Sequence, residues 1–318
     1  AGGFVGDALC RRLSASGHRV IGVYRDRPSL RNWMETRIAG DLTQQSDFSD
    51  VVKGADVVVH LAARVHMMRE TAIDPDLAFR QANADITRRL AQAAADAGVG
   101  RFLFLSSVKV NGEETTGTPF SEGDRPSPKD AYGRSKLEAE NALEKIAGTT
   151  DMSVTTLRVP LVYGPRVRAN FAALIRICDT ALPLPLDGIT ENRRSLLYLG
   201  NLTHALETVI RAGPDPAGTY LLSDGEDLST AALVGHLRNS LNRHPLRLPV
   251  PASVLQSVAS LAGKRQAVRD CAVPCRSILR DSAGHSAGHP PLVPLRGLRQ
   301  QPLRTAPPAS SSPHPTSL

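Results

Sequence analysis

Strand-like and helix-like segments alternate along the first third of the chain, and this alternation restricts the fold more than any other feature. Residues 19–24 predict a strand, and the apolar run 55–63 predicts a second strand that is buried on both faces. A helix expected over residues 84–97 leads into a third strand over residues 101–105. Because parallel strands need helical crossovers, we predict an α/β fold with a doubly wound parallel sheet.

Two glycines near the start, Gly3 and Gly6, open a helical pattern whose apolar positions are Val5, Leu9 and Leu13. Glycines at the N-terminus of a helix let the backbone approach a diphosphate, whose charge the helix dipole also favours. A plain turn would explain two glycines about as often, so the spacing alone leaves both interpretations open. In a βαβ unit a strand precedes such a loop, and no strand-like run stands ahead of Gly3.

The composition is that of a soluble globular protein. Its 318 residues are 41% hydrophobic and 22% charged, and no apolar run reaches the roughly 18 residues that a membrane span needs. The first residues do not resemble a secretory leader, and four cysteines fit a reducing compartment better than a disulfide framework. We therefore predict a cytoplasmic protein of one or two domains, without a membrane span.

The formal net charge of +7 does not indicate nucleic-acid binding. Residues after Gln266 account for +4 of it, and no basic run interleaved with aromatic residues precedes them. A metal site is equally poorly supported: Cys271 and Cys275 lack a second pair of ligands, and His60 and His66 have no further ligand at a useful spacing. We predict neither a nucleic-acid partner nor a bound metal.

Three polar residues could together move a proton to or from an alcohol. Ser106 and Ser107 close the apolar run 102–105, and Tyr132 lies four residues before Lys136. That spacing places the phenol and the amine on one face of a helix, where an ammonium would favour the phenolate and lower the pKa of the phenol. A tyrosine and a lysine four residues apart also occur by chance, with a packed ring and a solvated amine, so the context must decide.

Six short motifs supply that context. In chain order they are Gly3-Phe4-Val5-Gly6, Gly40-Asp41-Leu42, His60-Leu61-Ala62-Ala63, Ser106-Ser107, Tyr132-Gly133-Arg134-Ser135-Lys136, and Leu157-Arg158 with Val162-Tyr163-Gly164-Pro165. With these motifs the chain resembles the extended short-chain dehydrogenase/reductases, the branch of NAD-dependent epimerases and dehydratases that act on nucleotide sugars. The resemblance extends to about residue 265 and implies a Rossmann-like sheet with a small substrate lobe.

The resemblance also implies roles for these residues. Ser107, Tyr132 and Lys136 would be catalytic, and Tyr132 and Lys136 would also touch the cofactor. The other cofactor contacts would come from three segments: Gly3-Phe4-Val5-Gly6 at the diphosphate, Asp41-Leu42 at the adenine, and Leu61-Ala62-Ala63 beside the nicotinamide.

The end of the second strand of the family's sheet bears on the choice of cofactor. A site that prefers NAD places a carboxylate there, to accept hydrogen bonds from the ribose. Here Tyr24 stands at that position, and Arg25 and Arg27 follow, whose guanidinium groups could pair with a 2′-phosphate. The prediction is therefore NADP(H) or NAD(H), leaning to NADP(H) with Arg25 as a contact. Asp26 keeps NAD(H) open, and a solvated turn is the alternative without function.

The substrate that the resemblance implies is a UDP-sugar, and a homodimer is compatible with it. By resemblance Asn170 would bond the substrate diphosphate, and Arg194 would pair with a phosphate, which suits the geometry of a guanidinium group. Either residue could instead be an ordinary surface side chain.

The residues after Ser107 bear on the reaction. Dehydratases of this family carry an acidic pair there, whereas Val108 and Lys109 stand in this chain, so a dehydratase is disfavoured. Two reactions at sugar C4 stay open, that of a UDP-sugar 4-epimerase and that of a 4-keto-sugar reductase, because both use the same proton-transfer residues. The alternatives are a family member that binds NAD(P) without catalysis and an inactive, truncated or frameshifted remnant.

We expect three regions: an NAD(P)-binding domain over residues 1–165, interleaved segments over 166–268 that complete the sheet and form a substrate lobe, and a disordered low-complexity tail over 269–318. The tail is compatible with a reading-frame shift near Val268. In the family's topology a central strand leads into Gly3. Without that strand, its two neighbours would flank an open slot and the cofactor would bind weakly.

Overall fold

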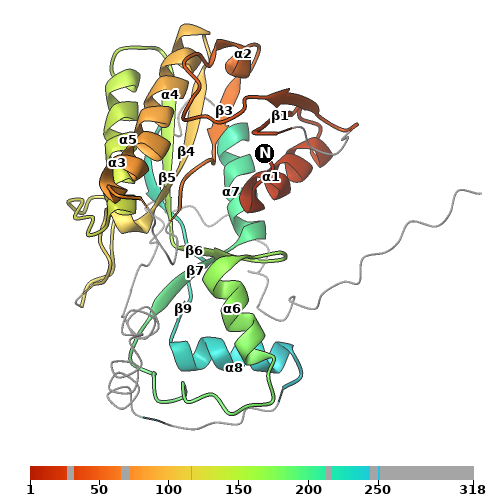
Figure 1. The fold of residues 1–318 in the computed structure, drawn as a ribbon, viewed down its shortest axis with the longest axis vertical. Helices are drawn as coiled ribbons and strands as arrows, with labels where there is room; N and C mark the ends of the chain where they lie inside the picture. The colour runs from red at the N-terminus through yellow and green to blue at the C-terminus, as the bar shows by residue number, and fades with distance from the viewer. Residues whose placement is uncertain (27–31, 66–71, 116, 213–216, 244–249, 251–318) are drawn as a thin grey trace, which may run out of the picture.

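The computed structural model describes residues 1–26, 32–65, 72–115, 117–212, 217–243 and 250. Figure 1 shows two lobes: an upper lobe in which helices flank a parallel sheet, and a lower lobe with a small sheet and two helices. The predicted Rossmann-like α/β fold is confirmed by this arrangement. The segment 269–318, for which a disordered tail is expected, lies outside the described residues.

The sheet of the upper lobe is parallel and consists of two parts. One part pairs β1 (Ile21–Tyr24) with β2 (Glu35–Ile38). The other part contains, in spatial order, β3 (Val57–His60), β4 (Arg101–Ser107), β5 (Ser153–Val159) and β8 (Gly218–Leu221). The strands predicted over 19–24, 55–63 and 101–105 correspond to β1, β3 and β4.

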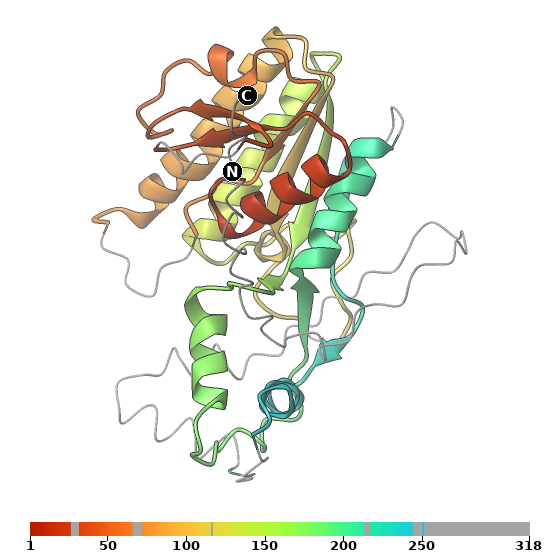
Figure 2. The ribbon, with the colours of Figure 1, turned by 90° about the vertical axis from the view of Figure 1, so that its right-hand side faces the viewer.

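Helices cover both faces of this sheet (Figures 1 and 2). On one face lie α2 (Ser49–Val52), α3 (Pro75–Phe79), α4 (Ile86–Asp96) and α5 (Ala131–Ala147), and on the other α1 (Phe4–Ala15) packs beside α7 (Leu199–Arg211). A π-helical segment, η1 (Arg80–Asp85), joins α3 to α4, so the helix predicted over 84–97 begins inside it. Among the described helices none could cross a membrane.

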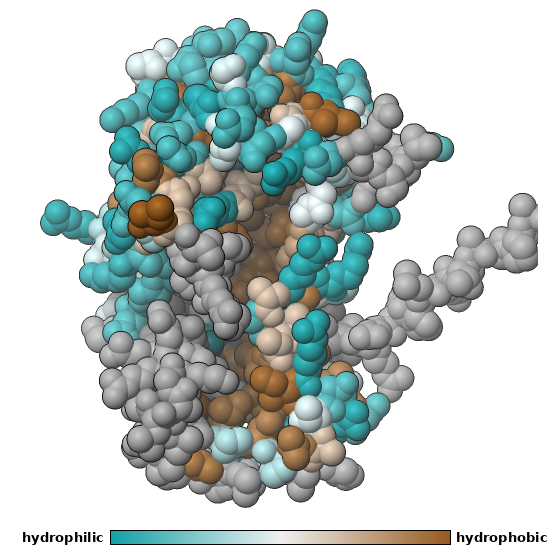
Figure 3. All heavy atoms as spheres, viewed as in Figure 1, coloured by the Kyte–Doolittle hydropathy of each residue, from teal (hydrophilic) through white to brown (hydrophobic). Residues whose placement is uncertain are grey.

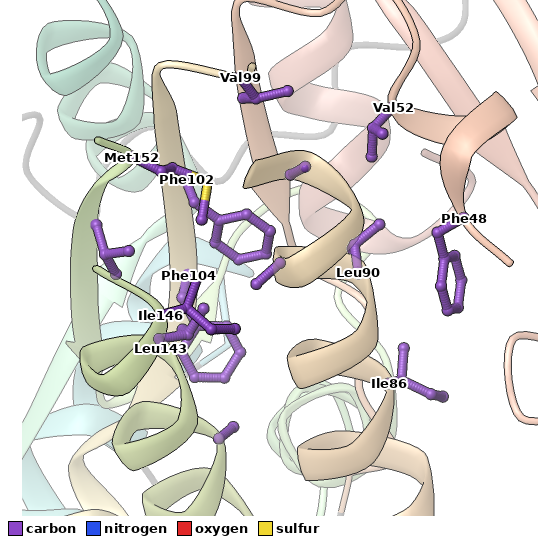
Figure 4. Close-up of a cluster of buried hydrophobic side chains, with 14 of the residues drawn as sticks. Phe48, Val52, Ile86, Leu90, Val99, Phe102, Phe104, Leu143, Ile146 and Met152 are labelled. Carbon is purple, nitrogen blue, oxygen red and sulfur yellow. The ribbon is translucent and has the colours of Figure 1, made fainter. Parts of the chain in front are cut away.

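Apolar side chains of β4 fill the space on both sides of the sheet. Phe102 and Phe104 point into a cluster that Leu90 of α4 and Leu143 of α5 complete (Figure 4). Leu103, between the two phenylalanines, belongs to a second cluster on the opposite face. Burial on both faces explains why this strand is a continuous apolar run rather than an alternating one.

A cavity of about 340 Å³ lies between β1 and β3, the two strands that border the break in the sheet. Apolar side chains including Leu9, Val23, Val57 and Val59 line it. At its edge the α-ammonium group of Ala1 donates a hydrogen bond of 2.5 Å to the carbonyl oxygen of Val23. The open slot expected between these two strands is therefore present.

The chain enters the lower lobe after β5. There β6 (Leu161–Tyr163) pairs in parallel with β7 (Arg194–Tyr198), which pairs in antiparallel fashion with β9 (Asp227–Leu228). The helices α6 (Ala169–Cys178) and α8 (Thr230–Ser240) pack against this sheet. Since α7 and β8 return to the upper lobe, the chain interleaves the two lobes; the domain boundaries at 165 and 268 stay predictions.

Candidate active site

The carboxyl ends of β3, β4 and β5 meet at one edge of the sheet, which in doubly wound folds is where ligands bind. β4 ends at Ser107, and a 3₁₀ turn, η2 (Val108–Val110), follows it. On the face seen in Figure 3, a hollow with apolar side chains runs from the upper lobe toward the lower one. The residues predicted to be catalytic come from β4 and from the first turns of α5.

Ser107 and Tyr132 are brought together by the structure. Ser107 is buried as the last residue of β4, and Tyr132 is the second residue of α5. Asp130 caps this helix by accepting a hydrogen bond of 2.7 Å from the backbone N–H of Gly133. The Ser107 hydroxyl lies near enough to the Tyr132 phenol to lower the pKa of that phenol. The ring of Phe79 packs edge-on against the phenol ring, with 6.1 Å between centroids.

Lys136 follows one turn later on α5 and is only 2% exposed. Its Nζ atom donates a hydrogen bond of 2.8 Å to the carbonyl oxygen of Leu105 and lies 4.5 Å from the ring centre of Phe104. Burial lowers the pKa of Lys136 to about 7, although the charge of Glu140 acts in the opposite direction. This amine can therefore exchange a proton near neutral pH.

The pKa of Tyr132 shifts in the opposite direction from the sequence-based expectation. Burial, the largest influence, raises the pKa of the phenol to about 12. The interaction with the Ser107 hydroxyl lowers this pKa, the charge of Asp130 raises it, and the charge of Lys109 lowers it. The expectation assigned the lowering to Lys136. It fails because the phenol ring is partly buried and because the amine of Lys136 donates to a backbone carbonyl of β4.

The glycine loop at the start of α1 has room for a ligand on its outer side. Gly3 is the N-cap of α1, no side chain caps the helix, and a Cβ atom at Gly3 would meet nothing within 4 Å. At Gly6 a Cβ atom would lie 2.9 Å from the carbonyl oxygen of Ala1, so the tight turn requires glycine. Phe4 and Val5 are both half-buried, and Val5 packs against the core. Uncapped N–H groups at a helix N-terminus fit a diphosphate.

Arg25 and Asp41 lie side by side beyond the ends of β1 and β2. Arg25 approaches Asp41 with 3.3 Å between Nη2 and Oδ2. The other oxygen of Asp41 accepts hydrogen bonds of 2.9 and 2.8 Å from the backbone N–H and the hydroxyl of Thr43. Hydrogen bonds from Thr43 lower the pKa of Asp41, and the Arg25 charge adds to this effect. The carboxylate is therefore held in one orientation.

The remaining predicted cofactor residues have different surroundings. Leu42 packs against the cluster of Phe102 and, like Leu61 and Ala62, lines the cavity between β1 and β3. Ala63 is half-buried and follows them in the loop after β3. The cofactor contacts of these residues stay predictions.

The two predicted substrate residues lie in the lower lobe, on elements separate from those of Ser107 and Tyr132. Asn170 is exposed as the second residue of α6, and Arg194 is the half-buried first residue of β7. Neither side chain forms a hydrogen bond or an ion pair within the described part of the chain.

Sequence reasoning missed Asn83, which is 1% exposed and lies in the π-helical segment. Its side chain accepts a hydrogen bond of 2.8 Å from the N–H of Arg64 and donates one of 3.0 Å to the Arg64 carbonyl. It also donates a hydrogen bond of 2.9 Å to the hydroxyl of Ser135, the neighbour of Lys136. Asn83 therefore holds the loop after β3 against α5. An amide inside an apolar helical pattern was the available signal.

Glu140 was also missed, although it lies one turn beyond Lys136. Its carboxylate forms a buried ion pair with Arg158 of β5, with 2.7 Å between Nη2 and Oε2, and accepts a hydrogen bond from the hydroxyl of Ser106. Arg158 donates a further hydrogen bond of 3.1 Å to Asn111. Buried charges persist only when they are paired and hydrogen-bonded, so this network ties α5 to β4 and β5.

Comparison with known proteins identifies the family of this chain. The model of the NAD dependent epimerase/dehydratase family matches residues 1–221. The chain belongs to this family. Membership confirms the resemblance seen in the sequence, makes the chain an enzyme and establishes a nicotinamide dinucleotide as its cofactor class.

Individual relatives agree with the family assignment. The UDP-glucose 4-epimerase of Vibrio cholerae is 38% identical over 268 residues, which are 84% of this chain and 81% of that protein. The structure of MoeE5 in complex with UDP-glucose and NAD shares 28% identity with a TM-score of 0.64, covering 78% of this chain and 82% of MoeE5. A Thermus thermophilus UDP-glucose 4-epimerase in complex with NAD shares the fold, with a TM-score of 0.65 at 22% identity over 87% of this chain and 88% of that one.

Proposed function

We propose that this enzyme is a UDP-sugar 4-epimerase whose proton transfers depend on Ser107, Tyr132 and Lys136. The observation that carries the proposal is the proximity of the Ser107 hydroxyl, at the end of β4, to the Tyr132 phenol in the first turn of α5. The 38% identity with a UDP-glucose 4-epimerase over 84% of the chain supports the choice of reaction.

Each residue has a distinct task in this scheme. In its phenolate form Tyr132 takes the proton of the sugar C4 hydroxyl and returns it from the same phenolic oxygen, while Ser107 hydrogen-bonds the sugar oxygen and keeps it beside the phenol. Lys136, whose pKa is about 7, can gain a proton and so place a positive charge one turn from the phenol. When bound, the nicotinamide supplies a hydride acceptor and donor for C4.

The residues that would hold the dinucleotide fit it. The uncapped start of α1, with Gly3 at its N-cap and Gly6 in the turn, would hold the diphosphate. Asp41 would meet the adenine side. We favour NAD(H) over NADP(H), because the guanidinium group of Arg25 is paired with Asp41 and because the related MoeE5 structure contains NAD.

The lower lobe would hold the UDP-sugar. Asn170 and Arg194, neither of which is engaged with a described side chain, would bind the substrate diphosphate. The homodimer and the cytoplasmic location stay predictions.

A 4-keto-sugar reductase is the second candidate, and the pKa of Tyr132 is compatible with it. With its pKa raised to about 12, the Tyr132 phenol is protonated at neutral pH and is ready to donate to a ketone oxygen. An epimerase needs the same donation in its second half-reaction. The pKa of the phenol therefore does not separate the two functions.

The test is to incubate the purified enzyme with UDP-glucose and catalytic NAD(H), and to follow UDP-galactose by chromatography. An epimerase forms UDP-galactose without net NADH production, whereas a reductase oxidises NAD(P)H stoichiometrically when a 4-keto sugar is supplied. Tyr132→Phe should reduce turnover by about 10²-fold or more while the affinity for nucleotide changes little. Loss of nucleotide binding in this variant would instead indicate a structural tyrosine, and inactivity of the unaltered enzyme on UDP-sugars would reject the proposal.

A further inference from the structure

An ion pair connects the segment after Ser107 with the segment before Tyr132. Lys109 of η2 approaches Asp130, the N-cap of α5, with 2.6 Å between Nζ and Oδ2. The same Nζ atom lies 3.0 Å from Oε1 of Glu113. The side chains of Lys109 and Asp130 are about one-third and one-quarter exposed, so solvent screens this pair only in part.

Each partner of the pair is bonded to one of the two proposed catalytic segments. The backbone N–H of Lys109 donates a hydrogen bond of 3.3 Å to the hydroxyl oxygen of Ser107. Asp130 uses its other carboxylate oxygen, Oδ1, to accept a hydrogen bond of 2.7 Å from the N–H of Gly133, directly after Tyr132. The ion pair therefore joins the segments that present the two hydroxyl groups.

The backbones of these segments are also in direct contact. A Cβ atom on Gly133 would lie 2.8 Å from the carbonyl oxygen of Lys109, so η2 and the first turn of α5 pack without a side chain between them. A small shift of α5 relative to η2 would change the separation between the Ser107 hydroxyl and the Tyr132 phenol. Proton transfer is sensitive to such a shift, because it needs heavy atoms within hydrogen-bond reach.

We propose that Lys109 is a positioning residue of this enzyme. Its ammonium group holds Asp130 in place, so that the Tyr132 phenol stays beside the Ser107 hydroxyl, and it balances the negative charge of the Asp130 carboxylate. This inference rests on the proposed function. Lys109 stands where dehydratases of this family carry an acidic residue that supports elimination. In this enzyme we predict that a positive charge is required at that position.

Charges around the phenol support the electrostatic part of the proposal. Burial raises the pKa of Tyr132 most, and the interaction with the Ser107 hydroxyl lowers it. The two remaining influences are charges: that of Asp130 raises the pKa and that of Lys109 lowers it. Lys136, on the same helix, is bonded to a carbonyl of β4. Removing Lys109 would leave the Asp130 carboxylate unbalanced, two residues from the phenol.

The loop after β3 places a further charge, that of Arg64, near this site. Phe79 of α3 packs edge-on against the Tyr132 ring, and the guanidinium carbon of Arg64 lies 5.3 Å from the ring centre of Phe79. Phe79 therefore lies in contact with both Arg64 and the phenol ring. The ion pair of Lys109, in contrast, is bonded directly to the segments that carry the two hydroxyl groups.

The alternative is an ordinary partly exposed ion pair, which contributes little to stability and nothing to catalysis. The experiment compares Lys109→Met, Lys109→Arg and the double variant Lys109→Met/Asp130→Asn with the unaltered enzyme. Lys145→Met is the matched control, because Lys145 is an exposed lysine near the other end of α5. For each variant kcat, KM, the pH profile of kcat and the thermal midpoint are measured with UDP-glucose.

We expect Lys109→Met to lower kcat by about tenfold or more with KM changed by less than about threefold, and to move the limb of the kcat profile that reports ionisation of Tyr132 to higher pH. Lys109→Arg should restore most of kcat because it keeps the charge. The double variant should recover part of kcat, since a neutral amide in place of the Asp130 carboxylate no longer opposes the phenolate. Unchanged kcat and pH profile in Lys109→Met, or no rescue by arginine, would overturn the inference.

A readout that does not need turnover separates this inference from the proposed function. The protein has five tyrosines, and ¹³Cζ labelling with Tyr132→Phe as the assignment variant identifies the Tyr132 phenol by NMR. In Lys109→Met this phenol should titrate at higher pH than in the unaltered protein or in Lys145→Met. If the midpoint moves while the enzyme does not epimerise UDP-sugars, only the proposed function fails. An unmoved midpoint rejects the electrostatic role of Lys109.

Discussion

The Nζ atom of Lys136 lies 2.8 Å from the carbonyl oxygen of Leu105, inside the layer between α5 and the sheet. This contact holds the amine in a place where water does not stabilise its charge, and burial lowers its pKa to about 7. Glu140, one turn further along the helix, acts against that shift but is itself paired with Arg158. Lys136 is therefore a titrating group of this site as well as a hydrogen-bond donor.

This pKa predicts how the stability of the protein depends on pH. The pKa of Lys136 falls from 10.5 to about 7 in the folded state, so between these values the unfolded chain binds a proton that the folded chain does not. The contribution of Lys136 to the free energy of unfolding therefore rises with pH between these two values, by about 1.4 kcal/mol per pH unit. Below pH 7 both states are protonated, so this contribution no longer changes with pH.

Urea unfolding at several pH values within that window measures this slope. Lys136→Met should lack the increase that the unaltered protein shows, whereas Lys145→Met should keep it, because Lys145 is exposed. The comparison subtracts the other groups that titrate in the same range. Equal slopes in the unaltered protein and in Lys136→Met would show that the amine is not buried as described.

Local sequence patterns were sufficient for β1, β3 and β4 and for placing Tyr132 and Lys136 on one helix. Continuous apolar runs such as 102–105 predict strands that are buried on both faces, and a spacing of four places Tyr132 and Lys136 on one helix face. Such patterns fix Cα and Cβ positions. They do not fix the direction of a long side chain, which here depends on Leu105, thirty-one residues away.

Contacts distant in sequence explain what the sequence could not provide. The π-helical turn around Asn83 depends on hydrogen bonds to Arg64 and Ser135, which lie 19 and 52 residues away. A helical period cannot reveal one extra residue in a turn. The raised pKa of Tyr132 likewise depends on burial that only the assembled lobe provides.

The glycine loop gives a paired prediction about cofactor binding. Gly6→Ala places a methyl group 2.9 Å from the carbonyl oxygen of Ala1, so the turn must shift and the free energy of unfolding should fall by about 1–3 kcal/mol. Gly3→Ala meets nothing within 4 Å and should change that free energy by less than about 0.5 kcal/mol. If a diphosphate lies against Gly3, the same methyl group should weaken NADH binding by about tenfold.

Urea unfolding and isothermal titration calorimetry with NADH check both variants. Gly3→Ala is the more informative variant, because we expect it to keep its stability. If its affinity for NADH is also unaltered, the start of α1 does not hold the diphosphate. A loss of stability in Gly3→Ala would contradict the open space beside this residue.

The pair of Arg25 and Asp41 predicts how the choice of cofactor can be changed. Arg25→Ala should weaken NADPH binding by about threefold to tenfold and leave NADH binding almost unchanged, because only NADPH has a 2′-phosphate. Thr43→Val is a useful partner variant, since Thr43 orients the Asp41 carboxylate without touching Arg25. Calorimetric titrations of both cofactors at two salt concentrations measure these effects, and an equal loss for NADH and NADPH would place Arg25 outside the cofactor-selecting site.

The cavity between β1 and β3 predicts that the protein gains stability from an added strand. Both strands face an apolar space of about 340 Å³, and Ala1 already donates a hydrogen bond to Val23 at its edge. A segment of about five apolar, β-branched residues fused before Ala1 could extend along β1 and pair with both strands. Each buried valine or isoleucine contributes about 1.5–3 kcal/mol, against about 1–2 kcal/mol per residue for ordering the backbone.

We therefore expect the fused segment to raise the thermal midpoint by about 5 °C or more, given a net gain of a few kcal/mol. NADH affinity should rise with it, because the glycine loop would then continue directly from a paired strand. A fused segment with two prolines is the control, since proline lacks the N–H that the ladder needs. If both fusions give the same midpoint and the same affinity, the space between β1 and β3 does not accept a strand.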